Sequence, residues 1–111
     1  DVEGVARFYR EAFGLPEVAR HFTQTGALRS IWLDSAQTLV MVERTEEAAR
    51  QVAGVGAGPF LLAFSVEASE REALEGALER AGSVIEERTE HSSYARDPEG
   101  NRVAISHYPR P

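Results

Sequence analysis

Three histidines and one run of oxygen donors are the side chains of this sequence best suited to chemistry. His21, His91 and His107 stand apart along the chain, without the short spacings that let one helix or strand present two ligands to a metal. The acids and the amide within residues 97–101 alternate as in a calcium loop, but Arg102 stands where such a loop requires glycine. By themselves these residues predict no metal site.

Nucleophilic and cofactor chemistry have few candidates. The chain has no cysteine, and all 12 basic residues are arginine, which excludes a thiolate and a Schiff-base lysine. No phosphate-binding or dinucleotide-binding fingerprint is present, because the glycine-rich residues 54–58 precede a strand instead of opening a helix. Acid–base catalysis stays open, with Glu43, His91, Tyr94 and His107 as candidates, but the sequence defines no pair among them.

The composition of the chain limits the class of protein that carries these groups. A chain of 111 residues with 42% hydrophobic residues forms one small domain with its own core. Its net charge of −6 argues against binding to nucleic acid or to an anionic membrane, because both need a basic face. No apolar run reaches the roughly 20 residues of a membrane span, no signal peptide is visible, and the cytoplasm is the default compartment.

The first half of the chain reads as one helix followed by three strands. Residues 1–14 place apolar side chains on one face of a helical period, with Asp1 as N-cap and Gly14 at the end. The strands are expected at residues 17–22, 27–33 and 38–43, with a turn over residues 34–37 before the last of them.

The second half reads as a strand, a helix and three more strands. Residues 44–58 carry charge, alanine and glycine, which is typical of a linker, here with a short helix over residues 46–53. The capping-box spacing from Ser69 to Glu72 predicts the start of the helix, and Gly82 its end. The strands are expected at residues 60–66, 83–88, 92–97 and 102–106, with a tight turn at 97–101.

The two halves can be laid on each other. Residues 6–14 match residues 74–82, and residues 30–42 match residues 93–105, which predicts a duplicated βαβββ unit. The strand that would open the first unit is expected upstream of Asp1. We expect a single domain, residues 1–111, made of a first module at 1–43, a linker at 44–58 and a second module at 59–111.

Two motifs connect this pattern to a known family. Residues 7–15 (RFYREAFGL) resemble a family helix that ends in FY-x-x-x-LGL, and residues 97–102 (DPEGNR) resemble its DPDGN turn. Across essentially all of its length the chain is similar to the vicinal oxygen chelate superfamily, which groups glyoxalase I, bleomycin-resistance proteins and extradiol dioxygenases. The resemblance implies an α+β fold of two βαβββ modules, with a curled mixed sheet, outer helices and an inner cavity. Alone, both motifs describe packing and a turn, so they diagnose a fold and not a chemistry.

In metal-dependent members of that superfamily, His and Glu side chains on the strands hold a divalent ion that acts as a Lewis acid. The Glu of the last strand falls at Ala104 here, and its partner in the first module falls at Met41, or at Val40 in a shifted register. The His that opens the fifth strand falls at Leu61, and a fourth position would lie upstream of Asp1. None of the side chains in hand ligates a hard cation. We therefore expect no metal of the family type and no other cofactor.

The lining of the implied cup follows from these positions, because residues two apart on a strand share a face. It is mostly apolar with one guanidinium. It therefore suits a medium-sized organic ligand with an anionic or carbonyl group facing Arg102, unless Arg102 pairs with Asp97 or Glu99 at the rim. The predicted lining consists of Trp32, Met41, Leu61, Ser65, Arg102, Ala104 and Ser106.

Together these expectations favour a glyoxalase- and bleomycin-resistance-like protein that has lost its metal site and binds a small organic molecule. The resemblance also implies a homodimer, and an unpaired sheet edge would gain from pairing. Two alternatives stay open. One is a lyase, isomerase or dioxygenase of the superfamily that uses an unrecognised metal or none, and the other is a non-catalytic accessory domain.

Overall fold

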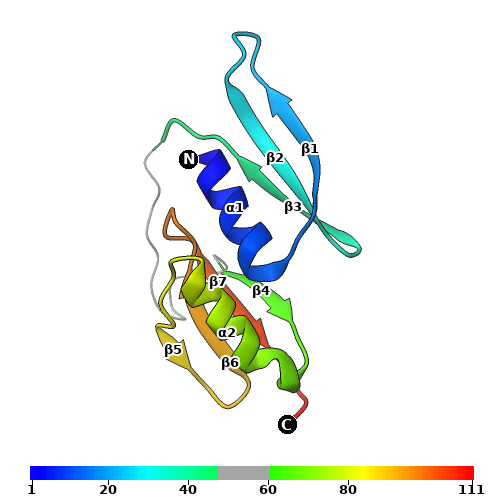
Figure 1. The fold of residues 1–111 in the computed structure, drawn as a ribbon, viewed down its shortest axis with the longest axis vertical. Coiled ribbons are helices and arrows are strands. Elements are labelled where there is room, and N and C mark those ends of the chain that lie inside the picture. The colour runs from blue at the N-terminus through cyan, green and yellow to red at the C-terminus, as the bar shows by residue number, and fades with distance from the viewer. Residues whose placement is uncertain (48–60) are drawn as a thin grey trace.

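A computed structural model describes residues 1–47 and 61–111. A three-stranded sheet lies at one end of the elongated molecule and a four-stranded sheet at the other, with both helices between and beside them (Figure 1). Most of the expected linker at 44–58, including most of its short helix, falls outside the described residues. In the two described ranges, no helix has the length and apolar character needed to span a membrane.

Helix α1 (Val2–Phe13) begins and ends where its capping residues predict. The Asp1 carboxylate accepts a hydrogen bond of 2.9 Å from the Gly4 amide, and Gly14 closes the helix in the left-handed conformation, with φ 66°. The apolar stripe expected from the sequence is buried, and its members are Val2, Val5, Ala6, Phe8, Tyr9 and Ala12. α1 packs on the three-stranded sheet and also contacts the second helix.

Three antiparallel strands follow α1 in the order β1-β2-β3. Alternation divides the side chains of these strands between two faces. Ile31 and Leu33 are fully buried in the core with α1, whereas Trp32 pairs with Met41 on the opposite face. The strands are β1 (Glu17–Phe22), β2 (Leu28–Ser35) and β3 (Thr38–Glu43).

The hairpin between β2 and β3 is tighter than the sequence indicated. The turn expected over residues 34–37 is wrong in extent, because Asp34 and Ser35 continue the ladder with β3. Ala36 takes a positive φ of 55°, the conformation that a two-residue hairpin turn requires. The other edge of β3 has no strand beside it in the described part of the chain.

The second sheet has the strand order β4-β7-β6-β5, in which β4 runs parallel to β7 and the other pairs are antiparallel. Its members are β4 (Leu61–Ser65), β5 (Glu87–Arg88), β6 (Ser92–Arg96) and β7 (Arg102–Ser106). The bounds of β7 are those expected. The strand expected at 83–88 is reduced to its last two residues. The first residue of that segment is fixed by side-chain hydrogen bonds in place of a strand ladder, because the Ser83 hydroxyl bonds to the Arg96 backbone.

Helix α2 (Arg71–Arg80) starts later than expected, after a 3₁₀ turn, η2 (Ala68–Glu70). The expected capping box from Ser69 to Glu72 is wrong by two residues, because the Glu70 side chain accepts a hydrogen bond of 2.9 Å from the Glu67 amide. Serine is the better N-cap by propensity. The helix nevertheless begins at Arg71 and not directly after Ser69, because the Arg71 side chain is held by hydrogen bonds to the second sheet.

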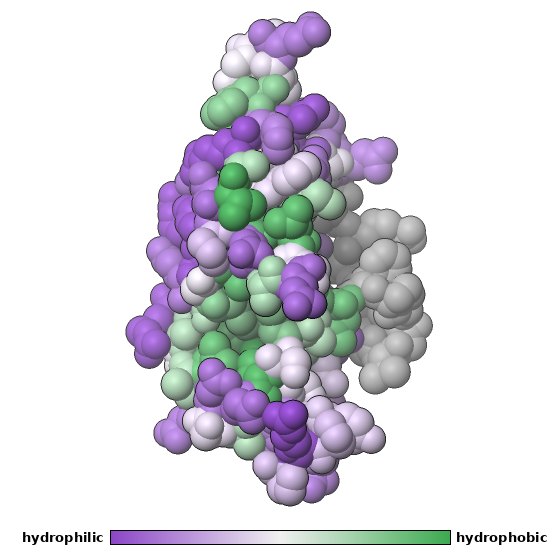
Figure 2. Space-filling view, turned by 90° about the vertical axis from the view of Figure 1, so that its right-hand side faces the viewer, coloured by the Kyte–Doolittle hydropathy of each residue, from purple (hydrophilic) through white to green (hydrophobic). Residues whose placement is uncertain are grey.

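One core joins the two halves. Phe13 of α1 stacks on Phe64 of β4 with ring centroids 4.2 Å apart, and Leu78 of α2 and Ile105 of β7 are fully buried. The expected mixed α+β fold with curled sheets is therefore confirmed. Figure 2 shows apolar side chains gathered on the face that carries β4 and the edge of the first sheet, between hydrophilic ends. The large exposed apolar residues of β1, β3 and β4 are Val18, Phe22, Leu39, Met41, Leu61 and Leu62.

Candidate functional site

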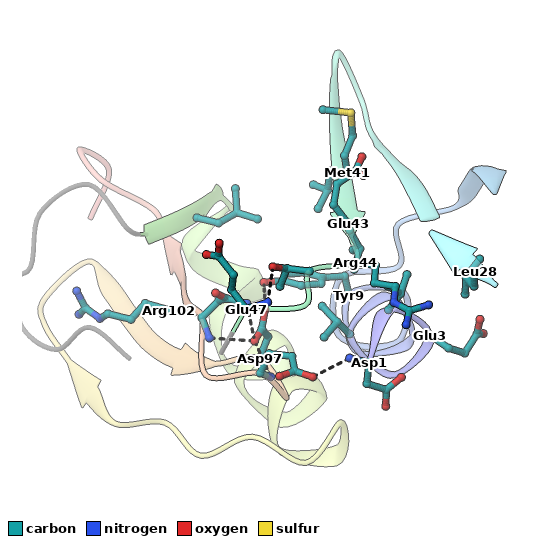
Figure 3. Close-up of a pocket in the computed structure, with 18 of the residues that line it drawn as sticks. Asp1, Glu3, Tyr9, Leu28, Met41, Glu43, Arg44, Glu47, Asp97 and Arg102 are labelled. Atoms are coloured by element: carbon teal, nitrogen blue, oxygen red, sulfur yellow. Dashed lines mark hydrogen bonds and ion pairs between the residues drawn. The ribbon is translucent and has the colours of Figure 1, made fainter. Parts of the chain in front are cut away.

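A hollow of about 1060 Å³ opens where the two halves of the molecule meet (Figure 3). Its walls are the first turns of α1, the end of β3 with the segment that follows it, the start of β4, and the turn between β6 and β7. The apolar side chains from the two strands are Val40, Met41, Val42, Leu61 and Leu62. Leu28 of β2 also lines it, so the hollow collects residues from five separate parts of the sequence.

Three of the seven predicted cavity residues line this hollow, namely Met41, Leu61 and Arg102. Met41 is 53% exposed and Leu61 is 39% exposed, so both present apolar surface to a ligand. Arg102 is buried, and its guanidinium carbon lies 5.1 Å from the centre of the Tyr94 ring. Figure 3 shows the Arg102 side chain extending away from Asp97.

The other four predicted residues lie on the sheet faces that continue from the hollow. Along β7, Ala104 and Ser106 follow Arg102 at alternate positions, and Ser65 of β4 is the cross-strand partner of Ser106. Trp32 of β2 is the cross-strand partner of Met41. None of these four lines the hollow itself.

The two sequence motifs meet in a buried hydrogen bond. The Tyr9 hydroxyl donates to Asp97 Oδ2 at 2.9 Å, and both residues are buried. The Asp97 carboxylate also accepts hydrogen bonds from the amides of Glu99 and Asn101 and from the Asn101 side chain. Burial, together with the charge and the hydrogen bond of Asp97, raises the pKa of Tyr9 well above its ordinary value of 10.0. The phenol therefore remains a proton donor to Asp97 throughout the neutral range.

Sequence reasoning missed this contact. It assigned Tyr9 to packing and Asp97 to a turn, and the two residues stand 88 positions apart. No local pattern reports a pairing over that separation. Only their presence in two motifs of one family could have drawn attention to them together.

The histidines were expected to be isolated, and for two of them this is wrong. The rings of His91 and His107 lie 5.3 Å apart, because the β6–β7 pairing brings the start of one strand beside the end of the other. His21 contacts Ser30 through Nδ1 at 3.0 Å and lies beside Trp32. Of the acid–base candidates, Glu43 is the one that lines the hollow.

Arg71 uses all five of its N–H donors. They bind α2 to the segment between β5 and β6 and to the chain after β7, so one guanidinium fixes three parts of the second half. The acceptors are Ser93 Oγ (3.0 Å), the carbonyl oxygens of Glu90 (2.9 Å), Thr89 (2.8 Å) and Ser92 (2.7 Å), and His107 Nε2 (3.4 Å).

Glu75, one turn further along α2, supports this arrangement. Burial opposes ionisation of Glu75, but hydrogen bonds from Arg88 and Ser93 and the charges of Arg88 and Arg71 outweigh it and lower its pKa below the ordinary 4.5. The carboxylate therefore stays charged at neutral pH, 3.5 Å from the Arg71 guanidinium.

The family model of the glyoxalase-like domain matches residues 1–106. The chain belongs to this family. The glyoxalase-like domain thereby falls in the vicinal oxygen chelate superfamily, as its helix and turn motifs implied.

Solved structures similar to this glyoxalase-like domain include three with different names. A mutant of the fosfomycin resistance protein FosX from Listeria monocytogenes, complexed with Mn(II) and dihydroxypropylphosphonic acid, has a TM-score of 0.79 at 14% identity, over 96% of this chain and 83% of that one. TioX from Micromonospora sp. ML1 has a TM-score of 0.71 at 21% identity, over 97% and 90%. Lactoylglutathione lyase from Agrobacterium tumefaciens has a TM-score of 0.69 at 21% identity, over 96% and 84%. These identities show the shared fold alone, and no curated protein matches the sequence.

The donor set of this glyoxalase-like domain does not fit the metal of metal-dependent relatives. Met41 offers a soft thioether, Leu61 an alkyl chain, and Ala104 a methyl group that is 2% exposed. Within residues 1–47 and 61–111, no three side chains of the His, Cys, Asp and Glu types are grouped so as to hold an ion. We therefore derive no chemistry through a metal.

Proposed function

We propose that this domain binds a small organic molecule in the hollow, without a metal of the family type. The observation that carries the proposal is that Met41 and Leu61 stand where relatives are expected to place metal ligands, and that both are exposed in a hollow of about 1060 Å³. Drug-sized molecules occupy pockets of roughly 300–1,000 Å³. The walls here are part apolar and part charged, so the expected mostly apolar lining is wrong. Covering such walls gains about 25 cal/mol for each Å² of apolar surface.

The proposed binding surface extends beyond the hollow along both sheets. It centres on Met41, Leu61 and Arg102 and continues over the adjoining sheet faces. On the first sheet it includes Trp32, and on the second it includes Ser65, Ala104 and Ser106.

The single methionine of the chain gives this proposal a direct test, because Met41 lines the hollow and is the cross-strand partner of Trp32 in the proposed surface. A small molecule that raises the melting temperature is expected to shift the ¹³C-methyl NMR signal of Met41. Leu61→Asn should weaken its binding about tenfold, since a polar amide would then be desolvated by the ligand.

The matched control is Val84→Asn, which adds the same amide at a 71% exposed position outside the hollow and should leave Kd unchanged. A stabilising ligand that leaves the Met41 signal in place would contradict the proposed site. So would stoichiometric Ni, Zn, Mn or Fe in the purified protein together with loss of ligand binding on chelation.

We also propose that two copies pair, in the cytoplasm, along the edge of β3 that has no neighbouring strand among the described residues. Leu39 is 46% exposed next to the open edge of β3, and burying such surfaces favours dimers. Sedimentation velocity should give the mass of a dimer, and Leu39→Asp should shift it towards the monomer. Val84→Asp should not. A wild-type chain that sediments as a monomer at high micromolar concentration would overturn this part of the proposal.

A further inference from the structure

We infer that the molecule taken by the hollow is an organic cation with an apolar body. This inference rests on the proposed function, since it names the class of ligand for the same site. Its basis is the charge of the walls, where, among the residues that the structure describes, carboxylates outnumber guanidiniums by five. The acids are Asp1, Glu3, Glu43, Glu46, Glu47, Asp97 and Glu99, and the bases are Arg44 and Arg102.

Several of these charges already have partners. Glu3 lies within salt-bridge distance of Arg10 and Arg20, which stand outside the hollow. Arg44 pairs with Glu46 at 3.1 Å, and Glu99 pairs with the amino group of Asp1 at 2.9 Å. The Asp1 carboxylate accepts a hydrogen bond from the Gly4 amide. The Asp97 carboxylate is surrounded by hydrogen-bond donors from Tyr9 and the turn that follows it. These contacts hold the walls in place and neutralise the charge of Arg44.

Two carboxylates remain for a ligand. Glu43, at the end of β3, and Glu47, in the segment after it, are exposed and form no ion pair within the described residues. The Arg102 guanidinium lies over the Tyr94 ring, with its carbon 5.1 Å from the ring centre, and its side chain extends away from Asp97 (Figure 3). The negative groups of a concave surface reinforce one another, since low-dielectric walls focus the field.

The apolar walls define the rest of the ligand. Val40, Met41, Leu61 and Leu62 offer a surface that an aromatic or aliphatic body can cover. The partial positive charge at the start of α1 does not favour an anion, because Asp1 caps that helix and Glu3 lies in its first turn. An anionic group facing Arg102, the expectation from the sequence, is therefore disfavoured. The FosX complex, with its phosphonic acid and Mn(II), represents a different ligand class.

Three probes with one ring system and different charges test this inference. Naphthylethylamine, naphthylethanol and naphthylacetate are titrated into the full chain by calorimetry at low and at high salt. We expect the amine to bind about tenfold more tightly than the alcohol, and the acetate to bind most weakly, as one or two nearby carboxylates would cause. The preference should shrink at high salt, because ions screen exposed charges.

Substitutions of the two carboxylates test whether they cause the preference for the amine. Glu43→Gln with Glu47→Gln should reduce the preference for the amine to about threefold or less and leave the Kd of the alcohol unchanged. Glu11→Gln with Glu72→Gln removes the same charge from exposed helical positions outside the hollow and should keep the full preference. Equal melting temperatures would confirm that both double variants are folded.

The outcomes separate this inference from the proposed function. If the alcohol binds but the acetate binds as tightly as the amine, the hollow is a binding site and the inference is overturned. If both double variants lose the preference equally, the net charge of the chain is responsible and the inference is again overturned. If none of the three probes binds, the proposed function fails and the inference fails with it.

Discussion

Replacement of Asp97 with alanine is expected to destabilise the protein by about 3 kcal/mol. The buried carboxylate accepts hydrogen bonds from the Tyr9 hydroxyl and from the backbone and side chain of Asn101, so its loss leaves several donors without an acceptor. The same substitution detaches the β6–β7 turn from α1. Urea unfolding followed by circular dichroism measures the change in the free energy of unfolding.

Tyr9→Phe provides the matched variant, because it removes the hydroxyl and keeps the ring packed on Phe8 and Phe13. It should cost about 1 to 2 kcal/mol. The double variant should cost less than the sum of the two single variants, because their shared hydrogen bond can be lost only once. Strict additivity, or a cost below about 0.5 kcal/mol for Asp97→Ala, would show that this bond does not hold the turn to the helix.

Arg71→Met is expected to cost about 2 kcal/mol. The thioether fills part of the space but donates nothing, so the carbonyl oxygens of Thr89, Glu90 and Ser92 lose their partner. The segment between β5 and β6 should then open more often. Amide hydrogen exchange by NMR should show faster exchange in β6 than in β2.

The control is Arg88→Met, which removes an arginine that also pairs with Glu75 but is 55% exposed. Exposed ion pairs contribute little, so its cost should stay below about 1 kcal/mol. Equal destabilisation by the two variants, or unchanged exchange in β6 for Arg71→Met, would mean that the guanidinium does not tie the second half together.

Elements with strong local signals could be predicted from the sequence. α1 carries both of its caps and an unbroken apolar stripe, and β7 is a short apolar run after a proline–glycine turn. α2 shows where local signals compete. Ser69 to Glu72 and Glu67 to Glu70 share the spacing of a capping box, and the contacts of Arg71 with the sheet fix the first helical residue.

The candidate site could be predicted only in part. The family resemblance assigned Met41, Leu61 and Ala104 to the cavity, and alternation along the last strand placed Arg102 on the same face as Ala104, so Met41, Leu61 and Arg102 could be named together before the hollow was seen. The acidic walls could not be predicted, because Glu3, Glu47 and Glu99 come from a helix, a connecting segment and a turn that only the folded chain brings together. The direction of Arg102 depends on Tyr94, a neighbour across the sheet.

The parallel pairing of β4 with β7 bears on the order of events during synthesis. β1, β2 and β3 are consecutive, so each of their hairpins closes a short loop as soon as it leaves the ribosome. β4 must instead wait until α2, β5 and β6 have emerged, and meanwhile both of its edges stay open to other nascent chains. Slow translation through the last strand would therefore prolong the interval in which this protein is most exposed to aggregation.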